Sequence, residues 1–121
     1  MYVISIESRF EASHQLILPD GSKESDHQHN WQVTAEVSSD RLNNEAVVMD
    51  FRQLKAEVDE IVFELDGKPL EKIEYFQRNN PSAENVAKYI YERLKFKLPK
   101  GLKLQSVRVV EQPGFTAKFS E

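Results

Sequence analysis

Three histidines, the only ones among the 121 residues, are spaced so that all of them could bind one metal ion. His27 and His29 are two residues apart in a segment that alternates as a strand does, so both side chains point from one face at a rise of about 3.3 Å per residue. His14 ends a second strand-like run. Three imidazoles with an open fourth position are the ligands of a catalytic zinc ion. The pattern predicts Zn²⁺ on His14, His27 and His29, although a His-x-His pair alone is more often an ordinary surface or core pair.

A second group with a chemical use is the carboxylate of Glu111. Val107, Val109 and Glu111 share one face of a predicted strand, so the glutamate ends an apolar row, where removing it from water is costly without a partner. Its two oxygens could accept hydrogen bonds from a ligand with adjacent N–H groups. The alternative interpretation is a strand-end glutamate that points into solvent.

Composition limits the class of protein. A chain of 121 residues, 40% of them hydrophobic, is enough for one domain, residues 1–121, with its own core. The net charge of -4 and the scattered lysines and arginines leave no basic stripe, so we expect no nucleic-acid partner. No segment approaches the roughly 20 apolar residues of a membrane span or resembles a secretion signal, so we expect a soluble, cytoplasmic protein without membrane contact. The absence of cysteine excludes disulfides, thiolate ligands and a thiol nucleophile.

Hydrophobic periodicity predicts six elements in the order strand, strand, helix, helix, strand, strand. The first helix has Asp50 as its N-cap, and the second begins near Asn80 and Pro81, a cap residue followed by proline in the first turn. The other predicted segments are strands at 2–14, 27–37, 102–111 and 115–119, a polar loop at 18–26, a polar turn at 40–45 and a short extended segment at 46–49.

This order of elements predicts an α+β fold, a four-stranded antiparallel sheet with two helices on one face. Such a sheet has two unpaired edges, and unpaired edges invite pairing with another chain. Self-association from edge to edge would satisfy them. We therefore expect a homo-oligomer whose sheets join.

Six ordered motifs, spread over nearly the whole chain, resemble the family of 6-pyruvoyl-tetrahydropterin synthase and 6-carboxytetrahydropterin synthase. They are Phe10-x-Ala12-Ser13-His14, His27-x-His29-Asn30-Trp31, Val48-Met49-Asp50-Phe51-x-x-Leu54, Leu65-Asp66, Asn80-Pro81-Ser82-Ala83-Glu84-Asn85 and Val109-Val110-Glu111. The resemblance implies a tunnelling-type ββααββ fold, zinc on the three histidines, and a pterin substrate anchored by Glu111 with help from Ser82 and Glu84. It also implies homotrimers whose sheets join into a barrel, commonly stacked as homohexamers, with sites between subunits.

The chain departs from this family at the groups that move protons. Where many members have a cysteine shortly before the first histidine of the pair, this chain has Gly21-Ser22-Lys23-Glu24, and the histidine that usually follows Leu-Asp is Gly67. In the family, the aspartate and histidine of this Leu-Asp-His sequence form a proton relay. Here only its aspartate, Asp66, is left as a candidate catalytic residue. Glu24, three residues before His27, resembles the glutamate that serves in place of cysteine in one branch of the family. That branch cleaves the side chain of dihydroneopterin triphosphate to give 6-hydroxymethyl-dihydropterin.

Three hypotheses of different classes remain open. The first is a zinc-dependent carbon–oxygen or carbon–carbon lyase that acts on dihydroneopterin triphosphate or a related dihydropterin, with Glu24 as general base and zinc polarising the side-chain oxygens of the substrate. The second is a binder of a pterin or purine-like ligand that has kept zinc and Glu111 but lost the ancestral reaction. The third is an unrelated metal-binding protein such as a cupin, which would lack the two amphipathic helices predicted here.

Overall fold

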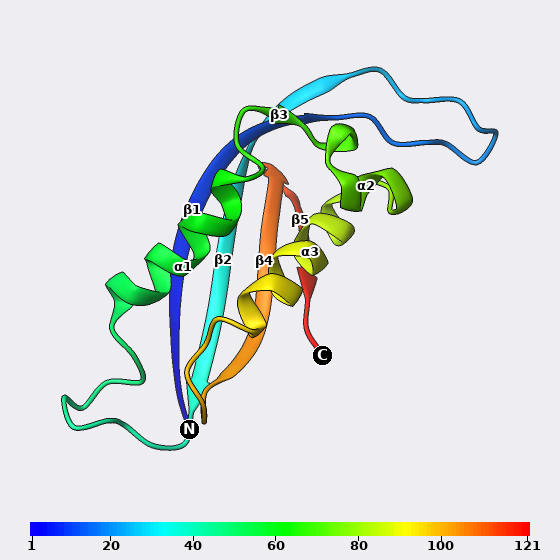
Figure 1. Ribbon diagram of the computed structural model, residues 1–121. Helices are drawn as coiled ribbons and strands as arrows, with labels where there is room; N and C mark the ends of the chain where they lie inside the picture. Colours follow the sequence, from blue (N-terminus) through cyan, green and yellow to red (C-terminus); the bar gives the residue numbers. More distant parts are fainter.

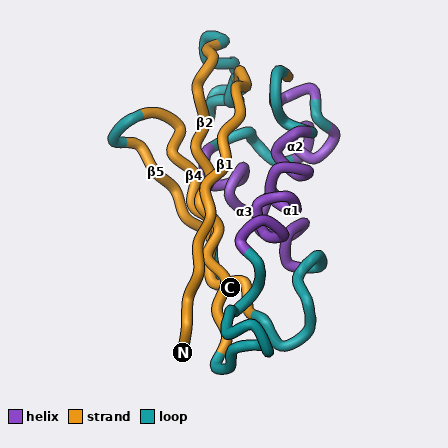
Figure 2. Tube along the Cα trace, turned by 90° about the vertical axis from the view of Figure 1, so that its left-hand side faces the viewer, coloured by secondary structure: helices purple, strands orange, loops and turns teal.

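A twisted sheet of five strands forms one layer of the computed structural model, which describes residues 1–121, and the helices lie together on one face of this sheet (Figures 1 and 2). The strand order is β3-β1-β2-β4-β5. The strands are β1 (Tyr2–His14), β2 (His27–Ser39), β3 (Lys68–Pro69), β4 (Lys103–Gln112) and β5 (Phe115–Phe119). The helices are α1 (Phe51–Phe63), the 3₁₀ helix η1 (Leu70–Lys72), α2 (Glu74–Arg78) and α3 (Ala83–Lys95). The predicted α+β fold is confirmed, with β1, β2, β4 and β5 as the four antiparallel strands.

The two longest strands, β1 and β2, show the alternation that the sequence predicts. In β1, Ile6 and Phe10 are buried beneath the helices, whereas Glu7 and Arg9 are exposed. The two strands pair without interruption from Tyr2, opposite Ser39, to His14, opposite His27. A slip of one residue would turn every side chain to the other face of the sheet, so the alternation itself specifies this register.

Both long helices begin at a side-chain cap. In α1 the Asp50 carboxylate accepts a hydrogen bond from Arg52 N at 2.8 Å, which confirms the predicted cap. In α3 the cap is Ser82, whose hydroxyl accepts a backbone N–H of the first turn at 3.2 Å, so the predicted cap at Asn80 is wrong. The reason is that the Asn80 side chain binds a neighbouring loop instead. None of the helices combines the length and the apolar character that crossing a bilayer requires.

Three short elements between α1 and α3 are additions to the predicted order. The chain turns at Gly67, where φ is +73°, pairs β3 with Ala12 and Ser13 of β1 in parallel, and continues into η1 and α2. Leu70 and Phe76 anchor these elements in the core. Elements of two to five residues are too short to show a hydrophobic period, which is why the sequence pattern misses them.

The loop between β2 and α1 contains no strand, so the extended segment predicted at 46–49 is wrong. Asn43 organises the loop, because its side-chain oxygen accepts hydrogen bonds from Glu45 N at 2.9 Å and Val47 N at 3.2 Å. Between those two residues Ala46 has a φ of +63°, and it is the only residue other than glycine with a positive φ. A residue with a Cβ atom adopts this conformation at a cost of about 1–2 kcal/mol.

Replacing Ala46 with glycine should therefore stabilise the fold. Glycine adopts a positive φ freely but loses more backbone entropy on folding, so we expect a net gain of about 0.5–1 kcal/mol and a rise of a few degrees in Tm. Ala56→Gly is the matched control, because Ala56 is exposed within α1, where the same substitution should destabilise by about 1 kcal/mol. Thermal unfolding followed by circular dichroism measures both variants. A lower Tm for Ala46→Gly would contradict the strain argument.

The sheet keeps two open edges. β3 pairs with β1 only at Ala12 and Ser13, so most of the outer edge of β1 has no partner strand. β5 is the last strand at the other side. Both edges therefore offer backbone N–H and C=O groups to a further strand.

Candidate active site

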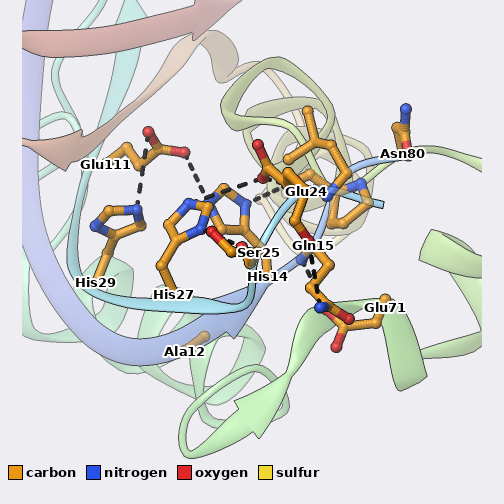
Figure 3. Close-up of polar contacts among 12 residues, drawn as sticks. Ala12, His14, Gln15, Glu24, Ser25, His27, His29, Glu71, Asn80 and Glu111 are labelled. Carbon is orange, nitrogen blue, oxygen red and sulfur yellow. Dashed lines mark hydrogen bonds and ion pairs between the residues drawn. The ribbon is translucent and has the colours of Figure 1, made fainter. Parts of the chain in front are cut away.

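The three histidines meet at one end of the β1–β2 pair, on the face that carries the core (Figure 3). The register places His14 directly opposite His27, and it places His29 opposite Ala12, two residues earlier in β1. Opposed side chains on one face of a sheet lie about 4.5–5.5 Å apart at Cβ, and diagonal neighbours remain within reach of long side chains. One ligand nitrogen of each histidine lies within 4.8 Å of the others. The three residues therefore converge as their spacing predicts.

Backbone carbonyls orient two of these rings. His14 Nδ1 lies 2.7 Å from Pro81 O, and His27 Nδ1 lies 2.9 Å from Ser25 O. Because a carbonyl oxygen only accepts, Nδ1 of each ring carries the proton, and Nε2 of the neutral ring presents a lone pair. Metal-binding histidines commonly have such a contact on their second nitrogen, which holds the ring in the ligating tautomer.

Two of the Nε2 atoms, those of His14 and His29, are buried and have no hydrogen-bond partner. A buried polar atom without a partner is destabilising, and such atoms in folded proteins usually have a ligand, an ion or water. Burial also lowers the pKa of His29, with further lowering by His27 and His14 and an opposing effect of Glu111. His29 is therefore held neutral, which is the state that binds a metal ion.

Trp31 packs against the cluster. It is fully buried, its Nε1 donates to Ala12 O at 3.2 Å, and its ring stacks on Phe10. The same ring lies edge-on to His14 and His29 at centroid distances of 5.1 and 6.0 Å. Packing against this large side chain restricts the rotamers of both histidines before any ligand binds.

Glu111 of β4 approaches the histidines from one side of the cluster (Figure 3). Its Oε1 lies 3.1 Å from His14 Nε2, and its Oε2 lies 4.0 Å from His29 Nε2, but neither contact is a hydrogen bond, because the Nε2 of a ring protonated on Nδ1 has no proton to donate. Only 22% of the side chain is exposed, so the carboxylate faces the cluster and not bulk solvent. Val107 and Val109, which precede it on the same strand face, are fully buried, in agreement with the apolar row seen in the sequence.

A surface cavity of about 360 Å³ opens beside Glu111. Ser82 and Glu84, at the start of α3, line it together with Glu111, so the three predicted substrate-binding residues share one cavity. The exposed ring of Phe115 lines it as well. Its volume falls within the roughly 300–1,000 Å³ range of small-molecule pockets. A larger cavity of about 900 Å³, between the β2–α1 loop and residues 99–102, contains none of the predicted site residues.

Glu24 approaches the cluster from the side opposite Glu111 (Figure 3). Its Oε1 lies 3.8 Å from His27 Nε2 and accepts a hydrogen bond from Leu16 N at 3.2 Å. The residue belongs to the connection between β1 and β2, which forms a small hairpin closed by a bridge between Ile17 and Lys23. Lys23 itself is exposed at this hairpin. The structure thus brings Glu24 to the histidines.

Asp66 is the predicted site residue that this chain does not bring to the cluster. Its Oδ1 accepts a hydrogen bond from Glu11 N at 2.9 Å, on the outer edge of β1. It makes no ion pair or hydrogen bond with any of the three histidines. Its position is next to the open sheet edge, where another chain could pair.

The sequence reasoning missed two residues that hold the chain just after His14. Glu71 accepts a hydrogen bond from Gln15 N at 3.1 Å, and Asn80 binds both backbone groups of Ile17. Asn80 stands in one of the six motifs, but the adjacent proline suggested a helix cap. Glu71 carries no local signal, because it lies in a 3₁₀ helix that the hydrophobic pattern does not reveal.

Comparison with known sequences identifies one family of pterin enzymes. The sequence profile of the family described as 6-pyruvoyl tetrahydropterin synthase matches residues 3–121. A Pyrococcus furiosus protein named dihydroneopterin monophosphate aldolase is 32% identical over 108 residues, which are 89% of this chain and 88% of the relative. A putative 6-carboxy-5,6,7,8-tetrahydropterin synthase of Archaeoglobus fulgidus is 35% identical over 112 residues, 90% of this chain and 87% of the relative.

The fold agrees with solved structures as well. The 6-pyruvoyl tetrahydropterin synthase of Caenorhabditis elegans superposes with a TM-score of 0.84 at 24% identity, over 100% of this chain and 97% of that one. At this identity the likeness shows the shared fold, whereas the profile match covers nearly every residue of the sequence. The chain belongs to the 6-pyruvoyl tetrahydropterin synthase family.

Proposed function

We propose that the protein is a zinc-dependent lyase that cleaves the side chain of dihydroneopterin triphosphate or a related dihydropterin. Membership of the family shows a pterin-processing function. The observation that carries the finer proposal is the position of Glu24, whose carboxylate lies 3.8 Å from His27 Nε2 in a chain without cysteine. The name of the Pyrococcus furiosus relative, an aldolase of dihydroneopterin monophosphate, supports cleavage of a carbon–carbon bond.

The donor set of the cluster fits zinc. His14, His27 and His29 would hold the ion through neutral imidazole nitrogens, and two of these nitrogens are buried without a hydrogen-bond partner. No thiolate is available, and the cluster offers one ligand atom from each of three residues, as catalytic zinc sites do. A bound zinc ion supplies Lewis-acid polarisation of the oxygens on the substrate side chain.

Glu111 is proposed to recognise the pterin ring. A pterin carries an amino group next to a ring N–H, and these two donors match the two oxygens of one carboxylate. Glu111 lies at the border between the histidines and the 360 Å³ cavity, so a ring bound to it would direct its side chain toward the cluster. Ser82 and Glu84 line the same cavity and offer further polar contacts, and the Phe115 ring offers an apolar face.

Glu24 is proposed to act as the general base. It takes the proton from the hydroxyl on the second carbon of the substrate side chain, and that oxygen becomes a carbonyl as the bond between the first and second carbons breaks. The electron pair of that bond moves to the first carbon and the conjugated pterin ring, and this carbon is then protonated. The products are a hydroxymethyl-dihydropterin and an aldehyde that carries the rest of the side chain.

A product assay tests the proposal directly. The purified protein, loaded with zinc, is incubated with dihydroneopterin triphosphate and, in parallel, with the monophosphate, and the products are identified by mass spectrometry. We expect 6-hydroxymethyl-dihydropterin from at least one of them. Binding of the pterin without turnover of either compound would show instead a ligand binder that has lost the ancestral reaction.

Glu111→Ala should abolish pterin binding while leaving zinc content and fold intact. Loss of two charge-assisted hydrogen bonds, each contributing about 1.5–3 kcal/mol, corresponds to a loss of affinity of at least about 100-fold. Calorimetry with a pterin or guanine analogue measures the affinity. Gln112→Ala is the control, because Gln112 is the exposed neighbour on the same strand. Unchanged affinity in Glu111→Ala would remove this residue from the binding site.

We also propose that the chain assembles into trimers or hexamers through its open edges. β5 ends the sheet on one side, and on the other side β3 covers β1 only at Ala12 and Ser13. Pairing of the uncovered part of one chain's β1 with another chain's β5 would close a ring of sheets. Asp66 lies on the β1 edge, so this assembly would bring it next to a neighbouring chain. Light scattering measures the mass, and a clean monomer at micromolar concentration would count against the assembly.

A further inference from the structure

The first residues after His14 are held by side chains in addition to the pairing within the hairpin itself. After His14 the backbone leaves the sheet, and three successive amides, those of Gln15, Leu16 and Ile17, each donate to a side-chain oxygen. The acceptors come from three different parts of the chain: Glu71 of η1, Glu24 of the hairpin and Asn80 before α3. Glu71 and Asn80 lie outside the hairpin, so their hydrogen bonds fix the position of the hairpin relative to the rest of the fold.

Asn80 makes the most complete of these contacts. Its Oδ1 accepts from Ile17 N at 2.8 Å, and its Nδ2 donates to Ile17 O at 2.9 Å, so one amide side chain satisfies both backbone groups as a partner strand would. Asn80 is itself held, because its backbone carbonyl oxygen accepts a hydrogen bond from Asn85 Nδ2 at 2.8 Å. The next residue, Pro81, accepts from His14 Nδ1. The segment before α3 thus holds both a cluster histidine and the start of the hairpin.

The hairpin connects Ile17, which Asn80 holds, to Glu24. Ile17 is bridged to Lys23, and Glu24 N donates to Leu16 O at 3.0 Å, while the Glu24 carboxylate accepts from Leu16 N. Ile17 and Glu24 are therefore joined through the strand pairing of the hairpin. A shift of Ile17 must move the Glu24 carboxylate relative to His27, whose own position is set by β2.

We infer that Asn80 is a positioning residue that holds the Glu24 carboxylate at the histidine cluster. The inference rests on the proposed function, in which Glu24 is the base, and it adds a residue that need not touch the substrate. A misplacement of a catalytic group by about 1 Å is enough to lower a rate about 100-fold. Asn80 therefore affects the chemical step more than the affinity for the pterin.

The test compares Asn80→Ala with Asn79→Ala in the full-length, zinc-loaded protein. Asn79 is the adjacent asparagine, but its Nδ2 donates to Tyr75 O and does not contact the hairpin. We expect Asn80→Ala to lower kcat about 10-fold to 100-fold, with KM, zinc content and the circular dichroism spectrum near wild type. Asn79→Ala should keep wild-type kcat. Equal kcat in Asn80→Ala and the wild type would overturn the inference.

A double-mutant cycle with Glu24→Gln separates positioning from a general structural role. If Asn80 acts through Glu24, Asn80→Ala should lower kcat by less than about twofold once Glu24 is already glutamine. An equal loss in both backgrounds would mean that Asn80 acts on the fold and not on Glu24. If Glu24→Gln alone keeps wild-type kcat, it is the assignment of Glu24 as base that fails.

A measurement independent of activity covers the case in which the wild type turns over no substrate. Trypsin can cut after the exposed Lys23 only when the hairpin opens, and Asn80→Ala removes two hydrogen bonds that hold it closed. We expect cleavage at this bond to be about 5-fold to 100-fold faster in Asn80→Ala, with no change in Asn79→Ala. If Asn80→Ala does not fold, Asn80→Asp is used, which keeps the acceptor for Ile17 N and should show a smaller increase. An unchanged cleavage rate would show that Asn80 does not hold the hairpin.

Discussion

Glu24→Gln is expected to lower turnover about 10²-fold to 10⁴-fold, while zinc content and pterin affinity stay near their wild-type values. Glutamine has the same shape, and its Oε1 can still accept the hydrogen bond from Leu16 N, so the hairpin should not move. What is lost is the group that takes the proton. The chain has no cysteine, Asp66 binds Glu11 N at the sheet edge, and the Glu111 carboxylate is assigned to the pterin ring, so in the proposed mechanism no other side chain takes over as base. The rate of product formation, followed by chromatography at saturating substrate, measures the effect.

Lys23→Ala is the control for this substitution. Lys23 precedes Glu24 in the same hairpin and is exposed, so its removal changes the charge of the loop without touching the cluster. It should cost far less in turnover than Glu24→Gln. If Glu24→Gln is as active as the wild type, the lyase mechanism described above is wrong.

His27→Ala and His29→Ala are each expected to strip the metal from the protein. With only three histidines available, losing one leaves two nitrogen ligands, and we expect the zinc content to fall from about one ion per chain to less than about a tenth of that after dialysis. Turnover should fall with it. Elemental analysis of the purified variants gives the zinc content directly, whether or not an activity is found.

Gln28→Ala serves as the matched control for the two histidine variants. Gln28 lies between them on β2, but it is exposed and points from the other face of the sheet toward Glu11. Its replacement should leave the zinc content unchanged. Full zinc occupancy in both His27→Ala and His29→Ala would exclude the cluster as the metal site.

The parts of the site that could be predicted are those that depend on local spacing. A period of two places His27 and His29 on one face with Trp31, and the structure confirms that arrangement. The same alternation along β1 brings His14 to the same face, since an antiparallel neighbour with one buried face has one acceptable register. The cap at Asp50 and the apolar row that ends at Glu111 are equally local signals.

The parts that the sequence does not predict depend on contacts between distant segments. Asn80 and Ile17 are 63 residues apart, so no local pattern relates them, and the proline after Asn80 favours the wrong interpretation, a helix cap. Glu71 reaches Gln15 from an element of three residues. The backbone conformation of Ala46 could not be predicted either, because alanine, unlike glycine, rarely adopts a positive φ.

The hairpin between β1 and β2 has a tip that is closed by its own hydrogen bonds. Leu18 N donates to Ser22 O at 2.7 Å and Gly21 N donates to Leu18 O at 2.9 Å, so residues 18–22 form a self-contained turn beyond the anchor at Ile17. The tip could therefore be exchanged while the three histidines, held by the sheet, keep their positions. Under the proposed lyase function, grafting tips of different length and charge beyond the bridge between Ile17 and Lys23 is a practical way to alter which phosphorylated side chains are accepted.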